Sequence, residues 1–381
     1  MTRSGWAALV GGAVLVLLGV VLSWPAAAVI GAGAVALVAL SLAFLLRPQK
    51  LEVSRWLDPA RIPRGEEALV HLTIGNSGGM TIPAQRAEQT VGAQEMRFVL
   101  PRLRKGTTVE RSFPLPTDRR GVFEVAPFST TRQDPFGLVK RTRAFGEAEE
   151  LWVYPRILPF RPLPAGFSRP AEGPTSDMAP QGSLTFHRLR EYVVGDDLRY
   201  VHWKSTARTG KLMVRHMVDT SQPFTVVVTD LRPQVYSETT FELALDAAAS
   251  AVVAASRSTG PIQMRLTDGT VVGDEDTADM QRPLDLLTAA EPDPNGSLTN
   301  ELLRLRRERG GTTLVIVTGA IDPMDVAAAS RLKRAFYRVM IISVVEPGSV
   351  PSSPTMTPGV TVLTVSTDDE LVGGWNLEAF R

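Results

Sequence analysis

The first 50 residues are dominated by an apolar run that contains no charge. The run extends from Ser4 to Leu46 and is 43 residues long, twice the roughly 20 residues that cross a bilayer as a helix. The Ser23-Trp24-Pro25 segment divides it, because proline fits the first turn of a helix but not its interior. The pattern therefore predicts a transmembrane hairpin over residues 1–50, with spans at about residues 6–22 and 26–46.

The basic residues around the hairpin predict its orientation. Arg3 precedes the first span, Arg47, Lys50 and Arg55 follow the second, and the turn between them is uncharged. Since positive residues stay on the cytoplasmic side, we expect the protein at the plasma membrane with both termini and the soluble domains in the cytoplasm. The alternative is a signal peptide cleaved near Ala26–Ala28, after which a stop-transfer span would still remain.

Residues 51–157 change to short β-rich runs separated by turn formers, and no long amphipathic helix interrupts them. This pattern is typical of strands in an antiparallel sheet. We expect a small β-sandwich. Its expected strands are Leu51–Trp56, Ala68–Ile74, Arg97–Leu100, Thr107–Leu115, Val122–Val125, Leu138–Arg143 and Glu150–Tyr154.

The rest of the chain divides into three parts. Residues 158–185 are rich in Pro, Gly and Ser and predict a linker, and residues 186–218 hold a dense motif. From residue 219 to 381, apolar strands alternate with helices, which indicates an α/β domain with a parallel sheet covered on both faces. The expected strands are Phe224–Thr229, Ile262–Leu266, Thr313–Thr318, Val339–Val345 and Val360–Val365, and the expected helices are Thr239–Ser256, Leu298–Arg309, Asp325–Tyr337 and Asp368–Phe380.

Charge is divided unevenly along a chain whose formal total is +1. Residues 1–218 carry 28 Lys and Arg against 18 Asp and Glu, or +10, whereas residues 219–381 carry 13 against 22, or −9. Such a split indicates two halves with different surroundings, and the lipid bilayer is the anionic neighbour expected for the first. The basic strands between Arg97 and Arg143 either present solvated faces or attract anionic head groups.

The motif of residues 186–218 reads FHRLREYVVGDDLRYVHWKSTARTGKLMVRHMV. The Gly195-Asp196-Asp197 turn suits the start of a helix, because an Asp side chain accepts hydrogen bonds from free backbone N–H groups. Gly210 suits its end. We therefore expect a helix that runs to about residue 208, followed by a strand over Leu212–Val218.

The same motif offers the groups of an acid–base site. His202 has the chemistry of a general base, Asp196 or Asp197 could orient it, and Arg199 or Arg208 could hold an anionic substrate. A hydrolase-type enzyme would use the groups in this way. The sequence leaves this alternative open.

Other features argue against catalysis and for a structural role of the motif. The chain has no cysteine and no GxSxG elbow, and Ser205 lies three residues from His202 on an ordinary helix pattern, so no nucleophile is evidently activated. The histidines lack the HExxH spacing of a zinc site. In the structural alternative the Asp pair caps the helix, His202 is hydrogen-bonded at a domain seam, and Trp203 is buried.

The motif resembles the signature of the domain of unknown function 58 family. Two earlier segments, Asp134-Pro135-Phe136-Gly137-Leu138 and Val153-Tyr154-Pro155-Arg156, are similar to the β region of that family. The resemblance implies a bacterial, membrane-tethered protein whose distal domain is similar to a von Willebrand factor A fold, but it assigns no reaction. The motif positions that carry it are Gly195, Asp196, Asp197, Arg199, His202, Trp203, Lys204, Thr206, Arg208, Gly210 and Arg215.

The implied distal fold normally binds a divalent ion through Asp-x-Ser-x-Ser after its first strand, where carboxylate and hydroxyl groups supply hard oxygen ligands. This chain has Asp230-Leu231-Arg232-Pro233-Gln234 instead. Both serines are missing, and the loop where a second Asp would help ends in Asp322. We expect a degenerate site at Asp230, without metal, and no other cofactor.

These observations predict a membrane-anchored scaffold or adaptor that faces the cytoplasm. Its acidic α/β domain would attract a basic partner. Members of the resembling family are often encoded beside MoxR-type AAA+ ATPases and transglutaminase-like membrane proteins, so we expect such an ATPase and other membrane proteins of the same system as partners, in cell-envelope or protein-maturation work. Membrane tethering and the near-zero total charge argue against nucleic acid.

Overall fold

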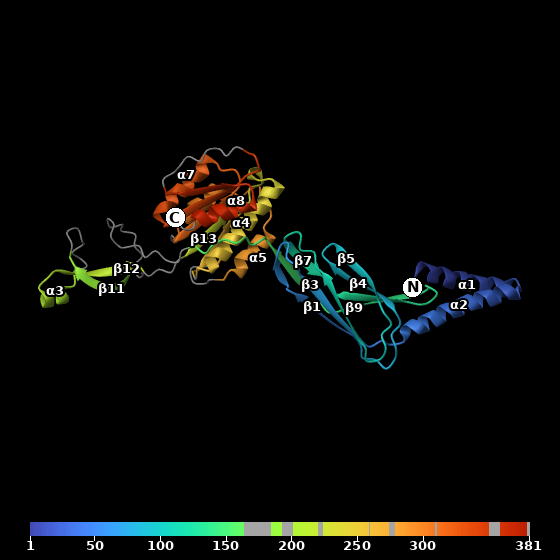
Figure 1. The fold of residues 1–381 in the computed structure, drawn as a ribbon. Helices are drawn as coiled ribbons and strands as arrows, with labels where there is room; N and C mark the ends of the chain where they lie inside the picture. The colour runs from blue at the N-terminus through green and yellow to red at the C-terminus, as the bar shows by residue number, and fades with distance from the viewer. Residues whose placement is uncertain are drawn as a thin grey trace. The chain divides into compact units, whose positions relative to one another are not determined.

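The computed structural model describes residues 1–163, 184–192, 201–219, 224–258, 260–273, 279–308, 311–349 and 359–378. The chain divides into two compact units, Met1–Tyr154 and Pro155–Arg381. The first holds two helices and a β region, and the second holds an α/β region (Figure 1).

The N-terminal helices α1 (Arg3–Val21) and α2 (Pro25–Leu46) are long and apolar enough to cross a membrane, as the sequence predicts. Pro25 lies in the first turn of α2, where its missing N–H costs no hydrogen bond. Glycines bring the two helices close together: a Cβ added at Gly19 would lie 2.4 Å from the backbone nitrogen of Ala28, and one at Gly31 would lie 2.5 Å from the carbonyl oxygen of Gly12. Small residues allow such backbone approach between membrane helices.

The β region of the first unit contains two sheets. A three-stranded antiparallel sheet has the order β1-β3-β6, and a seven-stranded sheet has the order β2-β10-β7-β4-β8-β9 with β5 paired to β4. The strands are β1 (Leu51–Asp58), β2 (Arg61–Pro63), β3 (Leu69–Asn76), β4 (Gln85–Val91), β5 (Gln94–Leu100), β6 (Thr108–Pro114), β7 (Gly121–Val125), β8 (Phe128–Gln133), β9 (Lys140–Phe145) and β10 (Glu149–Tyr154).

The sequence misses three of these strands, β2, β4 and β8. In β4, polar and small side chains take the inward positions that apolar residues usually fill: Gln85, Ala87 and Gln89 are buried together with Val91. Period-two alternation of apolar and polar residues is therefore absent. The predicted strand at Leu138 starts two residues later, at Lys140, because Leu138 packs against the N-terminal helices instead.

The loop between β8 and β9 joins the β region to the helix pair. The Thr2 hydroxyl, which caps α1, donates to the carbonyl oxygens of Gly137 and Leu138 at 2.7 and 2.8 Å. Leu138 and its neighbour Val139 are buried in a small cluster with Val38 of α2. The segment Asp134–Leu138 is one of the segments that carry the family resemblance. Through it the β region contacts the two helices.

Asp134 holds that loop in shape from the inside. Its carboxylate accepts hydrogen bonds from the backbone N–H groups of Val139 (2.6 Å) and Phe136 (3.0 Å) and from the hydroxyl of Ser41 on α2 (3.1 Å). Burial alone would raise the pKa of Asp134, but these donors outweigh it and the pKa lies below its ordinary value.

The second unit contains a six-stranded sheet of order β15-β14-β13-β16-β17-β18. All neighbouring pairs are parallel except β14 and β15. The strands are β13 (Thr225–Thr229), β14 (Ile262–Leu266), β15 (Val271–Val272), β16 (Thr313–Thr318), β17 (Arg338–Val344) and β18 (Thr361–Val365), and the helices are α4 (Glu238–Ser256), α5 (Gln281–Ala289), α6 (Leu298–Leu305), α7 (Pro323–Arg331) and α8 (Asp368–Glu378).

The α/β pattern that the sequence predicts is present, with two additions. The strands β13, β14, β16 and β17 are almost wholly buried, which explains their largely apolar sequences, whereas β18 is mostly half-buried and the short β15 is more exposed. Val226 and Val228 of β13 pack with α6 and α7 in one cluster, and α4 lies against β13, β14, β16 and β17. Short α5 and β15 escaped the sequence analysis, and the predicted helix to Tyr337 ends at Arg331 with a 3₁₀ turn after it.

In the chain, two strands precede the α/β sheet. These strands, β11 (Leu184–Glu191) and β12 (Met213–Asp219), pair antiparallel, and the short helix α3 (Trp203–Thr209) lies between them in sequence. The expected strand over Leu212–Val218 is thus observed one residue further along.

Part of the predicted linker is an ordered strap on the α/β unit. Arg156 binds Asp246 of α4 with its backbone N–H (2.7 Å) and its Nε (3.0 Å), and its guanidinium also pairs with Asp368 of α8 (2.9 Å). Phe160 stacks on the buried Trp375 of α8 at 4.5 Å between ring centroids. Residues 155–163 therefore belong to this unit, and the remaining linker positions 164–183 lie outside the described residues.

The strap generates a prediction about stability. Replacing the buried Asp246 by Ala removes two charge-assisted hydrogen bonds and should lower the free energy of unfolding by about 2 kcal/mol. Amide hydrogen exchange in residues 155–163 of the detergent-solubilised chain should speed up as well. The control Asp369→Ala removes an exposed carboxylate of α8 and should change both by little; equal effects of the two variants would contradict the assigned role.

Candidate functional site

The carboxyl end of β13 is the point at which the strand order of the sheet reverses. The strands that follow β13 in the chain pair with it on opposite sides, β14 on one and β16 on the other. Open α/β sheets bind ligands in the crevice at such a point. Asp230 follows directly after β13 there and is fully buried.

An arginine of the same loop binds the Asp230 carboxylate. Arg232 Nε lies 3.0 Å from both carboxylate oxygens, and its NH2 group lies 2.7 Å from Oδ2. The backbone N–H of Arg232 also donates to Oδ1 at 3.1 Å, and the hydroxyl of Thr318, at the end of β16, donates to Oδ2 at 2.7 Å. Both oxygens of Asp230 are therefore occupied by donors of the chain itself.

The Arg232 guanidinium connects this carboxylate to a second one. Its NH2 group lies 2.8 Å from Oδ2 of Asp325, in the first turn of α7, and the other oxygen of Asp325 accepts from the hydroxyl of Thr299 at 3.0 Å. The pKa of Arg232 lies above its ordinary value. Hydrogen bonds to Asp230 raise this pKa most, burial lowers it, and hydrogen bonds to Asp325 raise it further. The cluster thus keeps one fixed cation between two aspartates.

The second aspartate is not the one that the sequence suggested. Asp322 caps α7 by accepting from the backbone N–H of Met324 at 2.9 Å. Asp325 lies one helical turn further and reaches the cluster. Thr299 and Asp325 were missed because their partners lie 26 and 93 residues away in the chain, and no local pattern reports such contacts.

These residues do not fit a divalent cation. Arg232 stands where the Asp-x-Ser-x-Ser pattern has its first serine, and its guanidinium holds the carboxylate oxygens that would bind the ion. A second cation at this spot would meet a fixed positive charge at short range. Over the described part of the chain, no group of three or more His, Asp or Glu side chains has a geometry suited to a metal ion.

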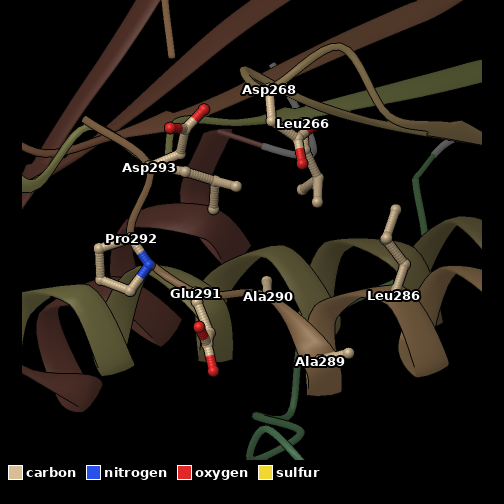
Figure 2. Close-up of a pocket in the computed structure, with 9 residues that line it drawn as sticks. Leu266, Asp268, Leu286, Ala289, Ala290, Glu291, Pro292 and Asp293 are labelled. Atoms are coloured by element: carbon tan, nitrogen blue, oxygen red, sulfur yellow. The ribbon is translucent and has the colours of Figure 1, made fainter. Parts of the chain in front are cut away.

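A pocket of about 310 Å³ opens at the same edge of the sheet. Figure 2 shows Leu286 and Ala289 on α5 and the acidic residues Asp268 and Asp293 across from them. An apolar floor with carboxylates around it suits a Lys or Arg side chain, which buries its methylene stem and keeps its charge at a polar tip. The lining residues are Leu231, Leu266, Asp268, Leu286, Ala289, Ala290, Glu291, Pro292 and Asp293.

The motif stretch folds differently from the predicted helix. Val201 forms an isolated β-bridge with Val214, and the helix starts only at Trp203, with His202 at its N-cap. The described helix therefore begins later than the sequence predicts, and Asp196 and Asp197 lie outside the described residues. Gly210 ends the helix in the left-handed region at φ +72°, as predicted.

His202 makes local structural contacts. Its Nδ1 accepts the backbone N–H of Ser205 at 3.3 Å and lies 2.8 Å from the Ser205 hydroxyl oxygen. Its backbone N–H donates to the carbonyl of Met213 at 2.8 Å. Thr206 completes the connection, since its hydroxyl donates to the His202 carbonyl and accepts from the Met213 N–H at 3.0 Å. His202 and Thr206 thus fasten α3 to β12.

The remaining motif residues fall into two groups. Trp203 is 68% exposed, so the expectation that it is buried is wrong; Lys204 and Arg208 are exposed too. The pairing of His202 with an aspartate stays a prediction. Gly195, Asp196, Asp197, Arg199 and the side chain of Arg215 lie outside the described residues.

The Asp230 cluster generates a test of the metal question. Wild-type protein should show no heat of Mg²⁺ or Mn²⁺ binding at this site, and no change on Asp230→Ala. Arg232→Ser should lower stability, because it leaves two buried carboxylates without their cation, and Mg²⁺ should then raise its melting temperature. The matched variant Arg257→Ser, at an exposed position, should gain no such response; tight wild-type binding that Asp230→Ala abolishes would contradict this assignment.

The comparisons with known proteins agree with the motif. Residues 188–352 match the model of the family described as "Protein of unknown function DUF58". A comparison with curated proteins gave no match. A Bordetella pertussis protein assigned as ApaA is 17% identical over 28% of this chain and 95% of that chain, with a TM-score of 0.20. β-Glucosidase 3B from Thermotoga neapolitana, in complex with glucose, is 15% identical over 27% of this chain and 17% of that chain, with a TM-score of 0.15.

Likenesses to solved structures at these TM-scores carry no argument about fold or activity. The family match stands by itself, and it covers part of β11, all of α3 and β12, and the α/β sheet except β18. It also contains the motif residues from Gly195 to Arg215. On this match, residues 188–352 of the chain carry the domain that defines the DUF58 family.

Proposed function

We propose that the chain is a membrane-anchored adaptor that holds a protein-binding α/β domain at the cytoplasmic face of the plasma membrane. The observation that carries the proposal is the Asp230–Arg232–Asp325 cluster, which fills the carboxyl edge of the sheet with a cation of the chain itself. Arg232 engages both carboxylates of the cluster, so neither is free to act as an acid, a base or a metal ligand. The edge retains a fixed shape and a negative charge, which suit the recognition of another protein.

The strand order supports a von Willebrand factor A-like fold for this domain. Counted along the chain, its strands follow the order 3-2-1-4-5-6, with the short third strand antiparallel. Asp230 lies at the end of the first strand, where that fold places its ion. In this proposal the β region between the helices and the strap is a sandwich-like spacer.

The charge of the domain indicates the chemistry of its partner. Residues 219–381 carry a net charge of −9, and the pocket at the sheet edge adds three carboxylates around an apolar floor. A partner that presents Lys or Arg side chains would be attracted and oriented by this field. The family resemblance suggests a MoxR-type AAA+ ATPase as that partner, together with other membrane proteins of the same system.

A second candidate function, a hydrolase that uses His202 with Asp196 or Asp197, is favoured by one observation. The Nδ1 atom of His202 lies 2.8 Å from the Ser205 hydroxyl oxygen, within the reach of a base and its nucleophile. A screen of the purified chain for ester, peptide and phosphate hydrolysis decides the question. Turnover lost in both His202→Ala and Ser205→Ala would favour the enzyme over the adaptor.

The orientation of the anchor can be tested directly. A reporter fused after Arg381 should be active in the cytoplasm, and one inserted at Ser23, between the helices, should be active outside. This follows from the basic residues before α1 and after α2. An extracytoplasmic signal at Arg381 would contradict the proposed topology.

The partner can be tested with purified components. The detergent-solubilised chain should bind the MoxR-type ATPase of the same organism at low salt and release it as salt is raised, since exposed charges are screened. Glu291→Lys, in the pocket wall, should weaken binding about tenfold. Asp369→Lys makes the same change of charge away from the pocket and should have a smaller effect; absence of binding at low salt would end the proposed partnership.

A further inference from the structure

A second pocket of the protein lies in the first unit, where α2 ends and the β region begins. Its volume is about 710 Å³. The chain segment after α2, the turn between β3 and β4, and β8 all contribute to it. Its charged lining residues are Arg47, Lys50, Arg102 and Arg132, and no acidic residue lines it.

Arg132 is the cation of this pocket that the chain holds by hydrogen bonds. Its NH2 group donates to the carbonyl of Phe44 at 2.8 Å and its NH1 group to that of Arg47 at 3.3 Å, so the side chain caps the C-terminal end of α2. The guanidinium carbon lies 4.4 Å from the centroid of the Phe44 ring. These contacts fix the guanidinium within the pocket and place an apolar ring beside it.

The positive charge of the pocket is not neutralised by the protein. In the described part of the chain, none of its four cations forms an ion pair with a carboxylate. Burial, followed by the positive charges of Arg47 and Arg141, lowers the pKa of Arg132. Four cations without a counter-charge around one cavity are unfavourable unless an anion joins them.

Two donors in the pocket also lack acceptors. The Nε of Arg132 and the Nε2 of Gln49 are buried and have no hydrogen-bond partner. Buried polar groups are nearly always paired, so each is explained by an acceptor that the chain itself does not supply. A phosphate offers several strong acceptor oxygens and a negative charge at once.

The position of the pocket decides which phosphate it is. If α1 and α2 cross a membrane, the last turn of α2 lies at the boundary of the hydrocarbon, where the head groups begin. The exposed Met80 and the ring of Phe44 line the pocket together with the cations, and they provide apolar surface for the start of an acyl chain. A free inorganic anion would make no favourable contact with that apolar surface.

We propose that this pocket binds the phosphate head group of an anionic phospholipid, with Arg132 and Gln49 at the phosphate and Arg47, Lys50 and Arg102 around it. The proposal rests on the membrane anchoring in the proposed function. It adds a specific lipid site to an anchor that otherwise relies on hydrophobicity alone. The bound lipid would hold the end of α2 and the turn between β3 and β4 together.

Native mass spectrometry of the full chain, purified in mild detergent with added lipid, tests the proposal. Wild-type protein should retain one phosphatidylglycerol per chain and little phosphatidylcholine. Arg47→Gln combined with Arg102→Gln changes two rim residues without side-chain hydrogen bonds in the described structure and should weaken phosphatidylglycerol binding roughly thirty-fold, or about 2 kcal/mol. Arg132→Gln should weaken it as well, with the added loss of the α2 cap.

The control variant combines Arg111→Gln and Arg119→Gln, on β6 and the loop after it, and removes the same charge away from the pocket. It should bind phosphatidylglycerol like wild type. Equal weakening by both double variants, or equal retention of phosphatidylcholine, would overturn the proposal. So would thermal stabilisation by inorganic phosphate alone that matches stabilisation by phosphatidylglycerol, because the ligand would then be a free anion.

Failure of the anchor is recognised separately. Resistance to carbonate extraction depends on α1 and α2 and not on the pocket, so both double variants should remain in the membrane fraction. Loss of wild-type protein from that fraction would refute the anchoring itself. A chain that stays in the membrane but shows no preference for phosphatidylglycerol would refute only the lipid site.

Discussion

A carboxylate that leaves water must find its hydrogen-bond donors or its cation within the fold, and three aspartates of this chain impose that constraint at its joints. Asp134 gathers backbone N–H groups and Ser41 around the loop that seats the β region on α1 and α2. Asp246 fastens the strap to α4. Asp230 binds Arg232 at the edge of the sheet. Each joint is therefore specified by a directional interaction in addition to apolar packing.

The pattern of hydrophobic residues was sufficient for the parts of the fold whose burial is uniform. The two apolar helices and the buried strands β13, β16 and β17 are largely apolar along their length, and a continuous apolar run predicts them directly. β4 and β8 were missed because glutamine, threonine and alanine take inward positions there. The start of α3 was misplaced because its N-cap is His202, which accepts the N–H of Ser205 and is not among the usual capping residues.

The candidate site, like the fold, has one part that the sequence predicts and one part that it does not. Sequence spacing brought Arg232 next to Asp230, since the two residues share a loop, and it predicted that the positive charge of Arg232 would oppose an ion. It did not find Asp325, Thr299 or Thr318, which come from separate elements and meet only in the folded sheet. Asp246 within the Ala-rich helix α4 was a usable signal, because a buried charge needs a partner, but its partner Arg156 lies 90 residues earlier in the chain, at the end of the predicted β region.

The guanidinium of Arg232 has one more consequence for the α/β domain. An ion held by oxygen ligands exchanges with solution, so its occupancy follows the free concentration of that ion and disappears with a chelator. A side chain cannot dissociate, and the charge at this edge is the same in every compartment and at every magnesium level. In the adaptor that we propose, the contact at this edge would be permanent rather than tunable, so any switching of what docks there would originate in the other molecule.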